Sequence, residues 1–448
     1  MERKPNVILI NCDDMGYGDL GCYGSEINHT PTIDALAEEG VRFTSFYAAS
    51  PVCSPSRSAL MTGCYPPRVG ITRVLFPGEP YGLDPEEYTM PKLFSDAGYA
   101  TMCVGKWHCG DQPESLPCRF GFDDYYGLPY SNDMGMQVGK TDFVKNPPLP
   151  LLSGDEVVEQ QPDQTCLTER YVAECISFIK ENRDKPFFLY FAQMHVHLPL
   201  YAPHHFVETS ENGDFGACMA DVDWSVKALL YELKRLGIYE DTMLIFTSDN
   251  GSRGDHGACN APLRGTKFTV WEGGQRVPFI VHWKGHVQEG MVVNSMASNI
   301  DLLPTFAAML DMPLQGKKID GVDVSRLLLG EDAPVRTEFC YYQDKNLAEI
   351  RKDNWKLHRA RKEEKVCELY DLEADLSETT DVADQHPEVV ARLETLAQQY
   401  AAELGDEIHG VTGAEIRPCL CVDNPKTLTE YDENHPYIVA LYDKGDVG

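Results

Sequence analysis

The chain lacks the features that mark membrane, repeat and low-complexity proteins. No apolar run approaches the ~20 residues that a membrane-spanning helix needs. Residues 1–6 lead straight into a short apolar segment, without the apolar stretch and cleavage site of a signal peptide. We therefore expect a cytoplasmic protein, or a periplasmic or secreted one whose leader has been removed. The absence of internal repeats and low-complexity segments excludes a solenoid architecture.

Basic residues are scarce. The chain has 39 Lys and Arg residues against 70 Asp and Glu residues, and its formal net charge is −31 at pH 7. Nucleic acids and anionic membranes bind basic surfaces, so the excess of acid argues against both as partners. An anionic substrate would need a local group of Arg, Lys and His side chains around a metal ion. Repulsion from the rest of the molecule should weaken as the salt concentration rises.

Paired cysteine motifs are also missing. The chain has 15 cysteines, an odd number, and no paired C-x-x-C spacing of the kind that binds zinc. The only closely spaced pair is Cys419 and Cys421. We expect most of the thiols to be reduced and buried, which suits a reducing compartment.

The composition and the pattern of apolar residues indicate a large α/β protein. With 448 residues, 43% of them apolar and 24% charged, the chain can form a large core and more than one domain or subdomain. Short apolar segments alternate with amphipathic ones, which predicts a mostly parallel sheet sandwiched by helices. The candidate strands are apolar throughout, as expected for strands buried on both faces, and span 6–10, 101–104, 187–191 and 243–246. The candidate helices span 56–62, 167–182, 222–236 and a segment beginning at Pro387.

The late part of the chain has a different pattern, which predicts a second unit. Short strand-like segments at 338–342, 348–351 and 354–358 precede the helix that begins at Pro387. We expect an N-terminal domain over residues 1–330 and a smaller α+β subdomain over residues 331–448, built on a short antiparallel sheet. The last forty or so residues are irregular in pattern and are expected to pack back on the first domain.

Chemically active residue types follow each of the four candidate strands. They are Asp13 and Asp14, then Lys106 and His108, then His195 and His197, and finally Asp249 and Asn250. In open α/β sheets, ligands bind beyond the carboxyl ends of the strands. Four strands that deliver carboxylates, Lys and His to one edge therefore predict a single converging site.

Four of these residues form a set of oxygen ligands: Asp13, Asp14, Asp249 and Asn250. Hard cations prefer oxygen, and three carboxylates with one amide suit Ca²⁺, with Mg²⁺ as the alternative. Taken alone, Asp-Asp and Asp-Asn-Gly also read as turn residues.

The stretch from Cys53 to Gly63 predicts a short helix. Ser54 can cap its start, Pro55 fits the first turn, and Gly63 is a typical stop. Cys53 would then lie at the positive end of the helix dipole, where backbone N–H groups favour an anion such as sulfate. The alternative for Cys53 alone is a small buried apolar side chain.

Cys53, Pro55, Ser56 and Arg57 match the C-x-P-S-R motif, and this stretch resembles the sulfatase family. Further similar segments lie at 11–21, 105–108, 248–251, 263–267, 271–274 and 368–372. The resemblance covers nearly the whole chain and implies an alkaline-phosphatase-like fold in which residues 1–330 are catalytic. It implies one divalent cation, usually calcium, and a maturing enzyme that oxidises Cys53 to the aldehyde formylglycine.

The resemblance also implies roles for individual residues. One hydroxyl of the hydrated aldehyde at residue 53 attacks sulfur, and the other expels sulfate as the aldehyde forms again. The same hydrate completes the ligand shell of the metal, and Asp249 is a candidate base for its proton. Arg57 and Lys106 hold the ionised hydrate, and His108 takes the proton from the second hydroxyl.

Two residues are implied on the substrate side, and a third is an open alternative. Lys267 would bind the sulfate and the leaving-group oxygen, together with Lys106. Of the two histidines after the third strand, His197 matches the family better as the donor to the leaving group, because Pro199 fixes the register. His195 either lines the substrate pocket or is an ordinary core histidine.

The predicted function is hydrolysis of a sulfate ester, with a sulfated carbohydrate as the expected substrate class. One alternative is a phosphonate or phosphate mono- or diesterase on the same fold with the same aldehyde. The other is a sulfated-glycan-binding protein whose Cys53 stays unmodified and which turns nothing over.

Overall fold

The computed structural model describes residues 4–137, 146–438, 442–446 and 448, and its centre is a large mixed sheet. The described residues place eleven strands in this sheet, ten of them in the order β11-β2-β10-β9-β1-β8-β4-β5-β6-β7, with β12 beside β2. The strands are β1 (Asn6–Cys12), β2 (Val41–Tyr47), β4 (Ala100–Gly105), β5 (Asp124–Gly127), β6 (Pro150–Ser153), β7 (Glu156–Gln160), β8 (Phe187–Ala192), β9 (Thr242–Ser248), β10 (Arg276–His282), β11 (Met291–Val293) and β12 (Ala297–Ser298). The central run β9-β1-β8-β4-β5 is parallel, and β10 joins it antiparallel.

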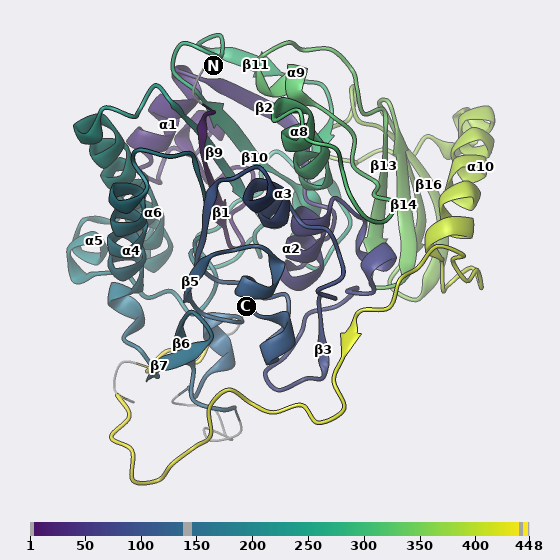
Figure 1. The fold of residues 1–448 in the computed structure, drawn as a ribbon. Helices are drawn as coiled ribbons and strands as arrows, with labels where there is room; N and C mark the ends of the chain where they lie inside the picture. Colours follow the sequence, from purple (N-terminus) through teal and green to yellow (C-terminus); the bar gives the residue numbers. More distant parts are fainter. Residues whose placement is uncertain (1–3, 138–145, 439–441, 447) are drawn as a thin grey trace.

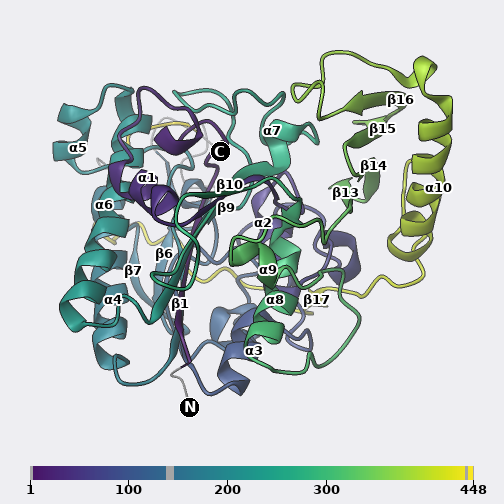
Figure 2. The same ribbon diagram turned by 90° about the horizontal axis from the view of Figure 1, so that it is seen from above.

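Helices cover both faces of this sheet (Figures 1 and 2). On one face lie α1 (Pro31–Glu38), α4 (Leu167–Glu181), α5 (His204–Thr209) and α6 (Gly213–Leu236), and on the other α2 (Cys53–Thr62), α3 (Met90–Asp96), α8 (Leu302–Met309) and α9 (Ser325–Leu328). Successive side chains of β1 alternate between the two cores, as the pleat requires. Ile8 and Ile10 belong to the core under α4 and α6, and Val7 and Leu9 to the core under α2 and α3.

A second sheet lies beside the first, toward the end of the chain. Four antiparallel strands follow one another in order: β13 (Glu338–Gln343), β14 (Asn346–Lys352), β15 (Trp355–Arg361) and β16 (Glu364–Asp371). The helix α10 (Pro387–Leu404) covers the outer face of this sheet, as Figure 1 shows. Its side chains Val389, Leu393 and Ala397 are buried against a third core that includes Ile350.

The chain after α10 returns to the first sheet in extended form (Figure 1). The two-residue strand β17 (Leu420–Cys421) pairs with β3 (Tyr81–Gly82). Lys426 then exchanges hydrogen bonds with Gln112, at 3.0 and 2.9 Å. The domain boundary at residue 330 stays a prediction.

The four predicted strands and the predicted α/β class are confirmed, with differences in detail. Helix α2 begins at Cys53, so Ser54 is not its cap, and the Ser54 hydroxyl instead accepts a hydrogen bond from the Leu75 N–H. Helix α6 begins at Gly213, nine residues before the predicted 222, and β16 was not predicted as a separate strand. In the described residues no helix is long and apolar enough to cross a membrane.

Candidate active site

The carboxyl ends of the central strands bring the predicted polar residues together. Asp13 and Asp14 follow β1, Lys106 follows β4, His197 follows β8, and Asp249 follows β9. The Asp13 N–H donates to the carbonyl of His195, and the Asp249 N–H donates to the carbonyl of Cys12, so backbone bonds fix the neighbouring strand ends. None of these side chains is more than 3% exposed.

The predicted metal ligands Asp13, Asp14, Asp249 and Asn250 form one cluster of oxygen atoms. The Asn250 amide donates to Asp14 Oδ1 at 2.7 Å, and the Asp14 N–H donates to Asp249 Oδ1 at 3.2 Å. Within the described residues, the buried oxygens Asp13 Oδ1 and Asn250 Oδ1 have no hydrogen-bond partner. Buried oxygens without a donor are costly unless a cation binds them, so this set fits a hard divalent ion.

Two lysines pair with the two aspartates at the end of β1. Lys106 Nζ lies 2.5 Å from Asp13 Oδ2, and Lys267 Nζ lies 2.7 Å from Asp14 Oδ2. Burial opposes the charge on Asp13, yet Lys106 and His197 hold the pKa of that carboxyl well below its ordinary value. Asp14 likewise supports the charged form of Lys267 against burial and raises its pKa. The acidic chain thus contains a local group of cations at this edge.

Arg57 joins the helix α2 to two strand ends. Its Nε donates to Asp249 Oδ2 at 2.8 Å, and its Nη1 donates to the carbonyl of Lys106 at 2.8 Å. The side chain is fully buried, and its Nη2 has no hydrogen-bond partner in the described part of the chain. Burial raises the pKa of Asp249 to about 7 although Arg57 opposes the shift.

Cys53 is the first residue of α2 and is 2% exposed. Its position places the thiol at the N-terminus of the helix, where N–H groups favour negative charge. Burial raises the pKa of the Cys53 thiol, whereas Lys106 and Lys267 nearby lower it. The side chain therefore lies within electrostatic reach of both lysines and of the oxygen cluster.

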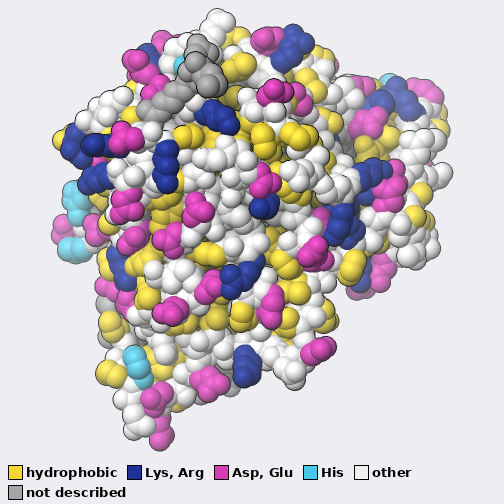
Figure 3. All heavy atoms as spheres, in the orientation of Figure 1, with side chains coloured by type: hydrophobic (Ala, Val, Ile, Leu, Met, Phe, Trp, Pro, Cys, Tyr) yellow, Lys and Arg dark blue, Asp and Glu magenta, His cyan; other side chains and the backbone are white. Residues whose placement is uncertain are grey.

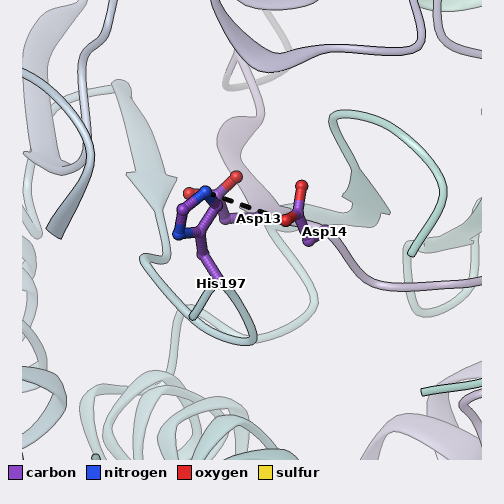
Figure 4. A group of neighbouring side chains, drawn as sticks. All are labelled: Asp13, Asp14 and His197. Atoms are coloured by element: carbon purple, nitrogen blue, oxygen red, sulfur yellow. Dashed lines mark ion pairs between the residues drawn. The ribbon is translucent and has the colours of Figure 1, made fainter. Parts of the chain in front are cut away.

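His197 lies beside the oxygen cluster, and Figure 4 shows its ring next to Asp13 and Asp14. His197 Nε2 is 3.8 Å from Asp14 Oδ2, and its Nδ1 lies 3.1 Å from Asn132 Oδ1. Asp13, Asp14 and His197 could by geometry hold a metal together. Burial, followed by Lys267, lowers the pKa of His197.

Two further residues of this group were not predicted. Ser131 Oγ accepts a hydrogen bond from Lys106 Nζ at 3.0 Å and lies 3.2 Å from His197 Nε2. Asn132 contacts the other nitrogen of the same ring. Both follow β5, a strand of four residues that the apolar pattern does not reveal, although the polar run after it is a usable signal.

The other two histidines predicted for the site, His108 and His195, have different surroundings from His197. His108 is buried, with Nε2 3.0 Å from the carbonyl of Leu75, and its Nδ1 has no partner. Burial and then Lys106 hold the pKa of His108 well below its ordinary value. His195 is also fully buried, but its ring faces Asp221 on α6 at 3.5 Å, so the structure does not bring it to the group around His197.

The end of the described chain lies over His197. Tyr442 is buried and donates to the carbonyl of Pro162 at 2.6 Å, and Lys444 binds Asp214 at 2.6 Å. The Gly448 N–H donates to Asp133 Oδ2 at 3.2 Å, and a Cβ added at Gly448 would overlap the His197 ring. Gly448 therefore lies against the His197 ring.

The face of the molecule drawn in Figure 3 carries charges of both signs. In Figure 3, Lys and Arg side chains are interspersed with Asp and Glu side chains, and no continuous basic patch is present on that face.

Comparison with known proteins gives a consistent set of relatives. The family model described as Sulfatase matches residues 5–312, and the model described as N-sulphoglucosamine sulphohydrolase, C-terminal, matches residues 266–403. Arylsulfatase A of Homo sapiens is 41% identical over 359 residues, which are 76% of this chain and 71% of that protein. N-acetylgalactosamine-6-sulfatase of Canis lupus familiaris is 37% identical over 380 residues, 80% of this chain and 72% of that protein. The crystal structure of Ps i-CgsB in complex with k-i-k-neocarrahexaose has a TM-score of 0.80 and 32% identity, covering 89% of this chain and 93% of that chain.

Proposed function

This chain belongs to the sulfatase family, and on that premise we propose that it removes sulfate from a sulfated carbohydrate. It is a sulfuric ester hydrolase with the alkaline-phosphatase-like fold of its structural relatives. The observation that carries the proposal is the group of Lys106, Lys267 and His197 at the oxygen cluster, with both lysines acting electrostatically on Cys53. Two of the relatives support the substrate class, because one is named N-acetylgalactosamine-6-sulfatase and the other was solved in complex with k-i-k-neocarrahexaose.

The proposal includes conversion of Cys53 to formylglycine by a maturing enzyme. Supporting it are the C-x-P-S-R motif and the place of Cys53 at the start of α2, within reach of two lysines. As a hydrated aldehyde, residue 53 would supply a hydroxyl nucleophile for sulfur and a second hydroxyl for release of sulfate.

One divalent cation is the second component, with Ca²⁺ preferred and Mg²⁺ possible. Asp13, Asp14, Asp249 and Asn250 would hold it together with residue 53, and it would supply positive charge that makes a bound hydroxyl easier to ionise. The two partnerless oxygens in this cluster are what support this set.

The chain's own side chains bind and orient the ester. Lys267 and Lys106 attract the sulfate oxygens, and Lys267 also stabilises charge as it develops on the leaving oxygen. His197 donates to that oxygen, and its ring is oriented for this by Ser131 and Asn132. Arg57 holds Asp249 and the end of β4 in register around residue 53.

His108 is proposed to take a proton from residue 53 at the release step. Its Nε2 is engaged by the carbonyl of Leu75, and its Nδ1 has no partner and is available to accept a proton. Its lowered pKa keeps the ring neutral, as a base requires.

Phosphonate or phosphate ester hydrolysis is the second candidate, since the same group would bind those anions. A two-metal phosphatase needs a second set of ligands at the site, and the described residues provide one oxygen cluster there. A sulfated-glycan binder with an unmodified Cys53 is the third candidate.

Neither the structure nor the relatives support the expected cytoplasmic location over export.

Three measurements test the proposal. The intact mass of the peptide that contains Cys53, from protein coexpressed with a maturing enzyme, is expected to show an aldehyde. Sulfate release is then measured on defined sulfated mono- and disaccharides, and nitrophenyl sulfate is compared with phenyl phosphonate. Cys53→Ala and His197→Ala are expected to lose most turnover. Faster turnover of the phosphonate would favour the second candidate, and an unmodified thiol with binding alone would favour the third.

A further inference from the structure

A buried group of charges lies between the two sheets, apart from the oxygen cluster. We call it the Lys356 cluster, and its members are Glu272, Glu349, Lys356, His358 and Glu378. Lys356 Nζ lies 3.1 Å from Glu272, 3.0 Å from Glu349 and 2.9 Å from Glu378. All five side chains are at most 1% exposed.

This cluster is not a second metal site. The carboxylates of Glu349 and Glu378 and the ring of His358 are close enough to hold an ion. The ammonium of Lys356 already contacts both carboxylates, and His358 bridges the same pair at 2.7 and 2.9 Å. The chain therefore supplies its own buried cation here, the Lys356 ammonium.

The cluster holds the loop that carries Lys267. Lys356 Nζ donates to the carbonyl of Val270 at 3.0 Å, and the Glu272 N–H donates to Glu378 Oε2 at 2.8 Å. Arg264 Nη1 donates to the carbonyl of Glu378 at 2.6 Å. Lys356 and Glu378 thus bind the loop at three places, on both sides of Lys267.

The same loop is attached to the catalytic sheet at its tip. The Lys267 N–H donates to the carbonyl of Ser252 at 2.8 Å, and the Phe268 N–H donates to the carbonyl of Pro51 at 3.0 Å. On the other side, Gln343 of β13 donates to the carbonyl of Phe268 at 2.8 Å. The Lys267 ammonium, 2.7 Å from Asp14, is therefore located by bonds from two sheets at once.

We infer that Lys356 and Glu378 are positioning residues for Lys267, so the second sheet contributes to the chemistry of the first. Removing the Lys356 ammonium takes one buried cation from three carboxylates, of which Glu349 and Glu378 keep His358 and Glu272 keeps Arg276. Buried charge with less compensation displaces its surroundings. The Val270 carbonyl would lose its Lys356 partner, and the loop that carries it would shift. A displacement of about 1 Å at a catalytic group can cost on the order of 100-fold in rate.

The inference rests on the proposed role of Lys267 at the leaving oxygen. It predicts that the loss of rate depends on the leaving group. A poor leaving group needs that ammonium more than a good one does. Misplacing Lys267 should therefore lower turnover of phenyl sulfate more than turnover of nitrophenyl sulfate. A merely structural role would lower the amount of folded enzyme and reduce both rates by the same factor.

The test uses the full chain, matured and loaded with cation, and the variants Lys356→Met and Glu378→Gln. We expect kcat/KM to fall on the order of 100-fold on phenyl sulfate and about tenfold on nitrophenyl sulfate. Gln343→Ala removes one bond from the surface side of the loop and should show the same trend more weakly with the fold intact. The matched control is Glu394→Gln, which breaks an ion pair with Arg359 on the same strand but does not touch the loop.

A double variant separates the two proposals. Lys267→Ala combined with Glu378→Gln should lose no more than Lys267→Ala alone, because a residue that acts through Lys267 has nothing left to position. Additive losses, or equal losses on both substrates, would overturn the inference. If Lys267→Ala itself affects both substrates equally, the proposed role of Lys267 fails and the inference fails with it.

Discussion

Arg57 shows how one side chain can hold several parts of the site. Its guanidinium reaches Asp249 after β9 and the carbonyl of Lys106 after β4, each at 2.8 Å. The planar guanidinium of arginine has several N–H donors and can make both bonds at once, whereas the ammonium of a lysine cannot. The position is therefore expected to require arginine itself rather than any positive charge.

Arg57→Lys should lower kcat/KM on the order of 100-fold, because the ends of β4 and β9 lose their common partner. It should also cost about 1–3 kcal/mol of stability, since a buried acceptor is left unmatched. Steady-state kinetics and denaturant unfolding measure the two effects. Arg326→Lys, an exposed ion pair with Glu331, is the control and should stay within about 0.5 kcal/mol. Unchanged activity of Arg57→Lys would contradict the assigned contacts.

His358 gives the molecule a pH dependence that is separate from the metal ligands. Burial and Lys356 oppose a charged ring, but Glu349 and Glu378 raise the pKa of His358 above its ordinary 6.5. The stabilisation from the charged ring is complete below pH 6.5 and is lost as the pH rises through the higher folded-state value. The difference in free energy of unfolding between the natural chain and His358→Gln should therefore shrink as the pH rises above 6.5. A difference that stays constant from about pH 6 to about pH 9 would refute this.

At the residue scale, the sequence predicts which residues form the site better than it predicts the direction in which each side chain points. Asp13, Asp14, Asp249, Asn250 and Lys106 lie in one group because strand ends in a parallel sheet converge, and Lys267 joins them from the loop between β9 and α7. The direction of the His195 ring toward α6 depends on how that helix packs, which local sequence does not encode. Ser131 and Asn132 were missed because the strand before them is too short to show a pattern.

At the scale of elements, helix α2 ends where the sequence predicts. Gly63 has a φ of 67°, in the left-handed region, and its N–H donates to the carbonyl of Ala59. The start of the helix was predicted at residue 56 and lies at Cys53, three residues earlier, because Ser54, a good cap by type, instead binds the loop at Leu75. The early start of α6 was missed because Gly213 and Gly216 argue against a helix by propensity, and packing overrides them.

Gly63→Ala should destabilise the chain by about 1–2 kcal/mol because a Cβ is disfavoured at this φ. Gly98→Ala is the matched control, since Gly98 has a φ of 83° and nothing within 4 Å of an added Cβ. An added Cβ at Gly63 would lie 3.2 Å from the carbonyl of Ile300, so this variant should lose more than the control. Thermal and denaturant unfolding of both variants give the comparison, and equal losses would show that crowding at Gly63 is negligible.

At the scale of the whole molecule, an acidic exterior surrounds a cationic site. The net charge of −31 repels sulfated polymers at long range, while in the proposed function Lys106 and Lys267 attract the ester at short range. The Debye length falls from about 30 Å at about 0.01 M salt to about 8 Å at about 0.15 M. Salt therefore removes the long-range repulsion and largely spares the buried contacts.

The kcat/KM for a multiply sulfated oligosaccharide should rise several-fold between those two salt concentrations. Nitrophenyl sulfate, with a single charge, serves as the control and should change less. Initial rates at constant pH and cation concentration make the measurement. A rate for the oligosaccharide that falls over this range would mean that attraction by the site dominates at long range.

The overall architecture is the part that sequence reasoning reaches least. Strand segments could be found one by one, but their order in the sheet, with β10 antiparallel between β2 and β9, depends on long-range pairing. The sequence gives no location for the expected return of the last residues, and in the structure Gly448 lies at His197. The match of the second family model from residue 266 to 403 also groups the Lys267 loop with the second sheet.

All ten residues of α2 are buried, and this has a consequence for the timing of maturation. If Cys53 is oxidised as proposed, the maturing enzyme needs access to it, and the finished helix buries it together with its neighbours. Oxidation and folding would then compete, and each molecule that folds first would keep its sulfur. The specific activity of a preparation would then record which process was faster in the producing cell.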